Sequence, residues 1–94
     1  MKKIVLVTGG FDPIHSGHIA YIKAAKQLGD LLFVGLNSDE WLTRKKGQPF
    51  LSLSERTTII ENLKMVDHCI TYDDTDDSSI DAIIQIRQKY PYDQ

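Results

Sequence analysis

An aliphatic run at residues 4–7 stands near the start of the chain and ends at Gly9 and Gly10. A continuous run of this kind is typical of a strand that is buried on both faces, as in a parallel sheet. Over residues 17–28 apolar side chains recur at helical spacing, and Gly29 supplies a stop signal. A second apolar run follows at 31–36. The pattern predicts strand, helix and strand, which is one βαβ unit.

A polar and basic stretch at 37–48 separates this unit from the next helix, with a short helical turn predicted at 39–43. Ser52 and Glu55 have the spacing of a capping box, so a helix is expected to begin there. Four apolar residues predict the inward face of this region: Ile59, Ile60, Leu63 and Val66.

Residues 69–72 predict a third strand, and the acidic run at 73–77 predicts a solvated loop, since it lacks the spacing of a calcium-binding loop. Ser78 and Asp81 offer a second capping box, for a last helix that stops before Pro91. That helix is marked by Ile80, Ile83, Ile84 and Tyr90. Strands that alternate with helices predict a three-layer α/β sandwich with a parallel sheet.

The size and composition of the chain suit one small domain. After Pro91 only three residues remain, where a doubly wound fold would start another strand, so residues 1–94 are expected to be the N-terminal part of a longer domain.

A net charge of -2 argues against a nucleic-acid partner. The apolar runs are too short to span a bilayer, and the single cysteine, Cys69, cannot form an internal disulfide, so a cytoplasmic location is expected.

The stretch from residue 9 to residue 18 carries the candidate chemistry, because it joins a buried strand to a helix, where α/β proteins place ligands. Gly9 and Gly10 let the backbone approach an anion closely, and the helix N-terminus adds unpaired N–H groups and partial positive charge. His15 and His18 lie three residues apart, so both imidazoles can face one phosphate group. Gly17 removes a side chain between them.

Other motifs for phosphate or metal do not match this corner. The chain has neither a P-loop nor a dinucleotide fingerprint. The His-x-x-His pair lacks the neighbouring glutamate of a metalloprotease helix, and His68 is distant in sequence, so no metal site is predicted. The remaining alternative is that His15 and His18 are ordinary exposed residues. Two histidines with glycines at a strand-to-helix corner favour phosphate binding instead.

The segment 9–18 matches the signature Gly-x-Phe-Asp-x-x-His-x-Gly-His, and so resembles the cytidylyltransferase-like nucleotidyltransferase superfamily. Further segments, at 37–40, 45–47, 54–56 and 65–67, resemble the glycerol-3-phosphate cytidylyltransferases and the nucleotidyltransferase domain that acts on heptose phosphates. The resemblance covers essentially the whole chain. It implies a Rossmann-like fold and transfer of CMP or AMP from CTP or ATP to a phosphorylated polyol or sugar, with Mg²⁺ and with release of pyrophosphate.

The resemblance also implies roles for individual residues. Gly10 and Phe11 would offer backbone groups to the nucleotide phosphates, alongside Gly9. His15 and His18 would donate hydrogen bonds to oxygens that gain charge in the transition state. Asp12 is expected to order the turn.

Five more residues are candidate ligands. Lys45 matches a family lysine on a mobile loop that grips phosphate, and Lys46 and Arg44 are near neighbours, although such runs are most often solvated. Arg56 matches a family arginine, and a cation in the first turn of a helix hints at a nearby anion. Asp39 is either a substrate ligand or a helix cap.

The family's later Gly-Asp element and its Ser/Thr-rich motif do not occur before Gln94. A non-catalytic nucleotide-binding module, or an inactive fragment, is therefore the alternative to an enzyme. An incomplete sheet also exposes an edge, and many relatives are dimers, so a homodimer is a third expectation.

Overall fold

A parallel three-stranded sheet forms the centre of the molecule, and the computed structural model describes residues 2–90. The strands are β1 (Ile4–Gly9), β2 (Leu31–Leu36) and β3 (His68–Thr71), in the order β1-β2-β3. Ile4 lies opposite Leu31, and Phe33 lies opposite His68, so all three strands end at the same edge of the sheet. The predicted parallel α/β fold is therefore confirmed.

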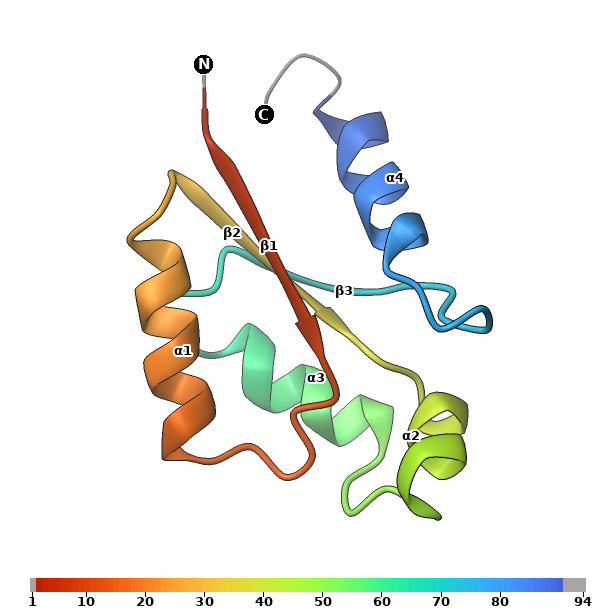
Figure 1. The fold of residues 1–94 in the computed structure, drawn as a ribbon. Coiled ribbons are helices and arrows are strands. Elements are labelled where there is room, and N and C mark those ends of the chain that lie inside the picture. The colour runs from red at the N-terminus through yellow and green to blue at the C-terminus, as the bar shows by residue number, and fades with distance from the viewer. Residues whose placement is uncertain (1, 91–94) are drawn as a thin grey trace.

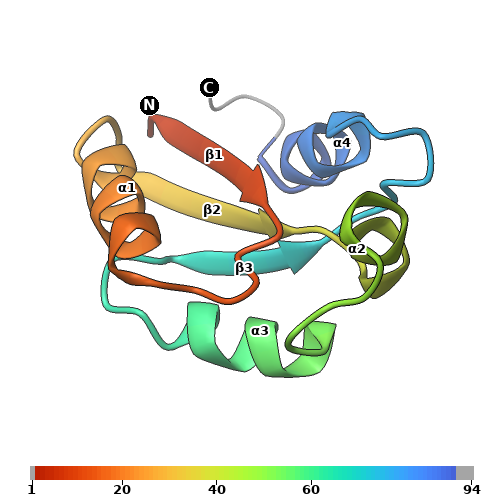
Figure 2. The same ribbon diagram turned by 60° about the horizontal axis from the view of Figure 1, so that its bottom comes forward.

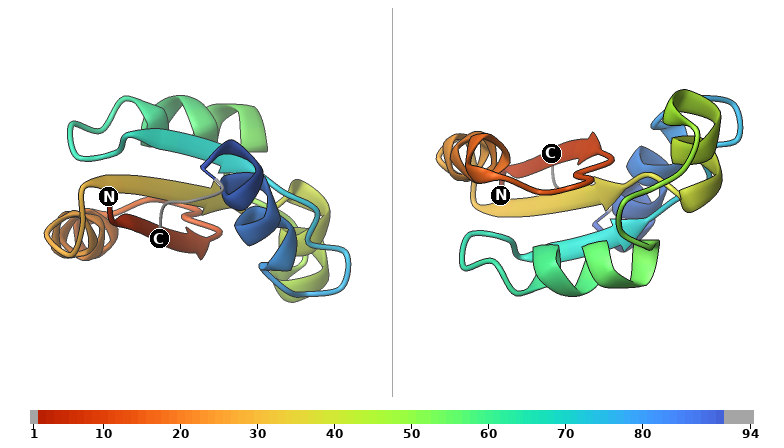
Figure 3. Two further views of the ribbon diagram at one scale, coloured as in Figure 1. Left: turned by 90° about the horizontal axis from the view of Figure 1, so that it is seen from above. Right: turned by 90° about the horizontal axis from the view of Figure 1, so that it is seen from below.

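Helices cover both faces of the sheet and its carboxyl edge (Figure 1). In the left panel of Figure 3, the view from above, α4 (Ile80–Lys89) lies in front of the strands and α3 (Leu53–Glu61) lies behind them. In the right panel, the view from below, this order is reversed. The first helix, α1 (Ser16–Lys26), packs on the α3 side. Figure 2 shows α2 (Asp39–Lys46) beyond the carboxyl end of β2. None of the helices within residues 2–90 is long and apolar enough to cross a membrane.

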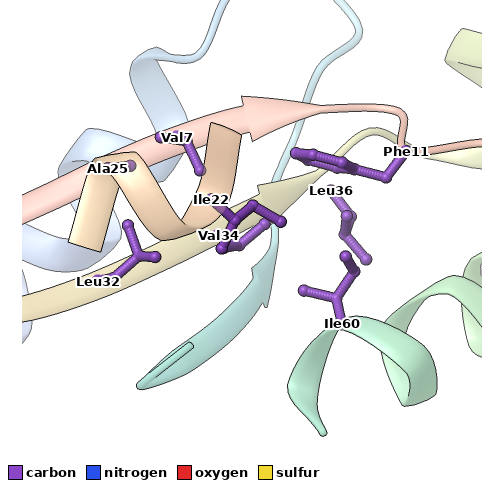
Figure 4. Close-up of a cluster of buried hydrophobic side chains, with 8 residues drawn as sticks. All are labelled: Val7, Phe11, Ile22, Ala25, Leu32, Val34, Leu36 and Ile60. Atoms are coloured by element: carbon purple, nitrogen blue, oxygen red, sulfur yellow. The ribbon is translucent and has the colours of Figure 1, made fainter. Parts of the chain in front are cut away.

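The core lies between the sheet and the pair α1 and α3, as Figure 4 shows. Alternate residues of β2 point into it because successive side chains of a strand face opposite sides. Burying each such side chain contributes about 1.5–3 kcal/mol. The fully enclosed members are Ile22, Leu32, Val34, Leu36 and Ile60.

Two details of the βαβ unit differ from the prediction. The central strand is β2, whereas β1 is mostly half-buried, because β1 pairs with a neighbour on one side only within the described residues. The helix α1 ends at Lys26, earlier than predicted, and Leu28 lies in the following turn with 63% of its surface exposed. The prediction that Leu28 continues the buried face was therefore wrong.

The next helices also differ in extent. The predicted turn at 39–43 is the longer helix α2, and its cap is Ser38, whose Oγ accepts the N–H of Trp41. Ser52 caps α3 as predicted, by accepting the N–H of Glu55. Leu63 and Val66 fall beyond the end of α3 but still pack against the core.

The last helix was predicted with the wrong cap and the wrong face. Ser79 occupies the N-cap position without a side-chain cap bond, because its Oγ meets the hydroxyl of Thr8 and Asp81 accepts the N–H of Asp73. The residues that α4 buries are Ala82 and Ile86. The residues expected to mark its apolar face, Ile80, Ile83 and Ile84, are about half exposed, and Pro91 lies outside the described residues.

Candidate phosphate-binding site

The loop from β1 to α1 leaves the carboxyl edge of the sheet in an unusual conformation. Phe11 has a φ of 50°, in the left-handed region that an aromatic residue seldom adopts. Its ring is nevertheless buried in the core and meets the ring of His18 edge-on at 5.1 Å. The ring of Phe11 thus links this loop to the core and contacts the ring of His18.

His15 and His18 cap the helix α1 reciprocally. The Nδ1 of His15 accepts the N–H of Gly17 at 3.0 Å, and the Nδ1 of His18 accepts the N–H of His15 at 3.2 Å. The two ring centroids lie 3.9 Å apart. This is the geometry of a capping box made by two histidines, in place of the usual serine and glutamate.

The cap also sets the tautomer of the two rings. Because both Nδ1 atoms accept hydrogen bonds, the neutral form of each ring carries its proton on Nε2. Burial, and then the charge of His15, lower the pKa of His18. His18 is therefore a neutral Nε2–H donor near pH 7, while His15 is exposed at the same corner.

Two glycines at this corner have side chains close to where a Cβ would lie. A Cβ on Gly17 would lie 2.9 Å from Cε1 of His15, so a side chain there would displace the capping ring. A Cβ on Gly10 would lie 2.8 Å from Cδ2 of Leu42 in α2. Gly17 was predicted to leave room for the histidines to reach a phosphate group, which stays a prediction. The structure shows that Gly17 leaves room for the His15 ring, and that Gly10 lets α2 approach the loop. Gly9 is less restricted, since its added Cβ would come no closer than 3.2 Å to the ring of Phe11.

Asp12 connects this corner to the loop between α2 and α3. Its side chain is fully buried, and its two oxygens accept the N–H groups of Phe50 and Leu51, each at 2.7 Å. Lys46 pairs with the same carboxylate at 3.0 Å and donates to the carbonyl of Asp12 at 2.6 Å. Burial alone would raise the pKa of Asp12, but Lys46 and the two N–H groups outweigh it and lower the pKa. The expected structural role of Asp12 thus extends beyond its own turn.

Arg56 lies at the centre of the carboxyl edge, with no exposed side-chain surface. Its guanidinium donates to the carbonyls of Leu51, Gly10 and Asn37, and it pairs with the carboxylate of Asp39 at 2.7 Å. These bonds join the β1–α1 loop, the end of β2, the start of α2 and the start of α3. The structure therefore places Arg56 and Asp39 against each other, and their contact with a ligand stays a prediction.

Lys45 and Arg44 lie in the last turn of α2, so the expected mobile loop is helical at these positions. Lys45 lies 5.4 Å from the centre of the Trp41 ring and 3.7 Å from the carboxylate of Asp77. Arg44 pairs with the same carboxylate at 3.2 Å. The three adjacent cations are thus divided between two partners, because Lys46 faces Asp12 instead.

Asp74 is the residue that sequence reasoning missed. It belongs to the acidic run expected to be solvated, yet it is only 3% exposed. Its carboxylate accepts the N–H and the hydroxyl of Ser38, each at 2.8 Å, and the side-chain amide of Asn37. Burial tends to raise the pKa of Asp74, but these bonds lower it overall. The loop that follows β3 therefore anchors the N-terminus of α2, and nothing in the residue types of the run separated Asp74 from its neighbours.

The β1–α1 corner, with its two histidines at a helix N-terminus beside a parallel sheet, is the kind of site that binds nucleotide phosphates. The sequence pattern of one family, described as Cytidylyltransferase-like, matches residues 6–91. The chain belongs to this family.

Individual relatives are similar over most of this chain. Two are named Bifunctional protein HldE: the protein of Campylobacter concisus is 40% identical over 88 residues, and that of Helicobacter pylori strain P12 is 41% identical over 75. These matches cover 92% and 78% of the chain but only 18% and 16% of the relatives, so the chain spans less than a fifth of their length.

A solved structure is also similar, the crystal structure of the lipopolysaccharide core biosynthesis protein from Thermoplasma volcanium. It has a TM-score of 0.84 and 32% sequence identity, and the match covers 93% of this chain and 70% of that one. The predicted Rossmann-like fold agrees with this similarity.

Proposed function

We propose that this chain carries the phosphate-binding part of a nucleotidyltransferase that moves CMP or AMP from CTP or ATP to a phosphorylated polyol or sugar. Membership in the Cytidylyltransferase-like family and the similarity to proteins named HldE support the class of reaction. The observation that carries the proposal is the reciprocal histidine cap, which occupies both Nδ1 atoms and leaves both rings with a proton on Nε2.

The reaction needs no covalent enzyme intermediate. A phosphate oxygen of the acceptor attacks the α-phosphorus of the nucleoside triphosphate, a new P–O bond forms, and the bond to the β-phosphate breaks as pyrophosphate leaves. Negative charge grows on the bridging oxygen and on the departing phosphates, so fixed N–H donors accelerate the step by stabilising that charge. His15 and His18 are proposed to supply those donors.

The other residues of the site are proposed to position this pair. Arg56 fixes the carbonyl of Gly10, and Asp12 ties the same loop to residues 50 and 51. Lys45 and Lys46 lie on the neighbouring helix α2 as candidate cations for a substrate phosphate.

Magnesium is proposed to arrive as part of the metal–triphosphate substrate. Residues 2–90 contain no cluster of three or more histidine, cysteine, aspartate or glutamate side chains that could hold an ion. The nearest carboxylate on the loop, that of Asp12, is fully buried and already accepts three hydrogen-bond donors. The described residues therefore do not fit a resident metal, and Mg²⁺ prefers phosphate oxygens and water in such complexes.

Calorimetric titration with CTP and with ATP, each with magnesium, tests the proposal. Saturable binding of one nucleotide that is weakened at least tenfold by His18→Asn would support it. The same samples, given glycerol 3-phosphate or a heptose phosphate, are then assayed for pyrophosphate release. Binding without turnover would favour the alternative, a non-catalytic nucleotide-binding module. If neither CTP nor ATP binds, the proposed site is contradicted.

A further inference from the structure

One carboxylate of the acidic loop after β3 is used differently from the others. Asp73 accepts the N–H and hydroxyl of Thr75, and Asp76 accepts those of Ser78, so both stabilise their own turns. Asp74 anchors Ser38, the N-cap residue of α2, as described above. Asp77 faces two cations of another element instead, and its role is not explained by the folding of its own loop.

The contacts of Asp77 form a two-cation arrangement. Its Oδ1 lies 3.2 Å from Nη2 of Arg44, and its Oδ2 lies 3.7 Å from Nζ of Lys45. The turn that presents this carboxylate is well defined, because the N–H of Asp77 and the guanidinium of Arg44 both donate to the carbonyl of Asp74. Asp77 itself has a φ of 63°. Two cations that converge on the two oxygens of one anion also match the oxygens of a phosphate group.

The ion pairs of Asp77 are more exposed to solvent than the neighbouring ion pair between Lys46 and Asp12. Lys46 binds a carboxylate with no exposed side-chain surface, whereas Arg44, Lys45 and Asp77 are 43%, 47% and 54% exposed. Ion pairs exposed to solvent are weak and are screened by salt. An anion from solution can therefore replace Asp77 far more easily than it can replace Asp12.

We propose that Asp77 is an internal substitute for a substrate phosphate. In the free protein its carboxylate occupies Arg44 and Lys45, and a phosphate group that enters the site displaces it and takes over both cations. Because the carboxylate of Asp77 carries one negative charge, a phosphate group with two charges displaces it more readily than a singly charged anion does. Arg44 and Lys45 therefore favour ligands that carry a phosphate group. This inference rests on the proposed function in one respect: only that function identifies the phosphate group as part of a substrate.

The test is calorimetric titration of the full chain with inorganic pyrophosphate at low ionic strength. Asp77→Asn is expected to bind pyrophosphate about threefold to tenfold more tightly than the unsubstituted chain, because two weak ion pairs no longer compete. Asp76→Asn is the matched control: it removes the same charge one residue away, from a carboxylate that accepts the N–H and hydroxyl of Ser78. The double variant Lys45→Ala/Asp77→Asn is expected to lose the gain.

Each alternative outcome overturns the proposal. Equal binding by Asp77→Asn and the unsubstituted chain would show that Asp77 does not compete, and an equal gain in Asp76→Asn would show a general effect of charge. Absence of saturable binding in both the unsubstituted chain and Asp77→Asn would overturn it as well. The proposed function is judged separately, by CTP and ATP binding and its loss in His18→Asn. It can therefore fail while the effect of Asp77 on pyrophosphate binding stands.

Discussion

His18 holds the backbone of His15 through its Nδ1 atom, at 3.2 Å, while the two rings lie with their centroids 3.9 Å apart. Each ring therefore has one nitrogen engaged by the start of α1 and one nitrogen that the cap does not use. Helix capping uses the Nδ1 edge of each ring, and the proposed ligand binding uses the opposite edge. The two roles can be separated by substitutions that retain only one of the nitrogen positions.

His18→Asn is expected to fold nearly as stably as the unsubstituted chain but to lose turnover. An asparagine oxygen can replace Nδ1 as the acceptor for the N–H of His15, whereas no atom replaces Nε2. Loss of one transition-state donor typically lowers kcat about 10²–10³-fold. Urea unfolding and pyrophosphate release, measured on the same sample, give the two quantities.

His18→Ala is the comparison variant, because it removes both nitrogen positions. It is expected to lose about 1 kcal/mol of unfolding free energy in addition to turnover, which is the usual contribution of a helix cap. An alanine variant as stable as the unsubstituted chain would contradict the capping role. Full turnover in the asparagine variant would contradict the role of Nε2.

The lowered pKa of His18 predicts how stability depends on pH. Its ordinary pKa is 6.5, and burial and the nearby His15 lower the pKa in the folded protein. Below about pH 6.5 the unfolded chain therefore binds a proton at His18 more readily than the folded protein does, so the unfolding free energy falls as the pH decreases. Urea midpoints at pH 7.5 and pH 5.5 should show this fall, and it should be smaller in His18→Asn.

Buried carboxylates do not interfere in that window. The pKa values of Asp12 and Asp74 are lowered from 3.8, so the stability that they contribute is present above pH 3.8 and is lost only at more acidic pH. An equal pH dependence in His18→Asn and the unsubstituted chain between pH 7.5 and 5.5 would rule out a lowered pKa at His18.

Arg56→Lys is expected to lower the unfolding free energy by about 2–4 kcal/mol, although the charge is kept. A lysine cannot reproduce the fork that joins three carbonyls and the carboxylate of Asp39, and the freed acceptors stay buried. Urea unfolding of Arg56→Lys and of Arg87→Lys, an exposed arginine of α4, gives the comparison. A loss below about 1 kcal/mol at residue 56 would mean that the clamp contributes little to stability.

The fold was largely predictable because apolar periodicity reports the packing of long elements. The runs that became β1 and β2, and the spacing that became α1, gave the parallel βαβ unit correctly. The errors fell at helix ends and in α4, where Ile83 and Ile84 suggested a buried face but Ala82 and Ile86 occupy it. Residue types alone do not show which of two apolar stripes a short helix buries when tertiary packing decides.

The residues of the candidate site could be proposed from the sequence, but the contacts between them could not. The signature at 9–18 identified His15 and His18, but their reciprocal cap depends on side-chain geometry that spacing alone does not fix. Arg56 was expected to bind a nucleotide phosphate, which stays a prediction, whereas its burial against three carbonyls and Asp39 could not be read from its residue type. The partners of Asp12 and Asp74 lie 34–39 residues away in sequence, so no local pattern could reveal them.

Gly17→Ala tests whether the position of the His15 ring matters more for ligand binding than for folding. Its Cβ would lie 2.9 Å from Cε1 of His15 and would push the ring off the helix end, whereas alanine is favoured over glycine within a helix by up to about 1 kcal/mol. The two effects oppose each other in stability, so the unfolding free energy is expected to change by less than about 1 kcal/mol. Affinity for CTP or ATP, whichever the unsubstituted chain binds, should fall about tenfold, because only the displacement of the ring affects binding. Ser16→Ala, at the exposed neighbouring position, is expected to keep that affinity, and equal affinities in the two variants would show that the ring position of His15 is not part of the site.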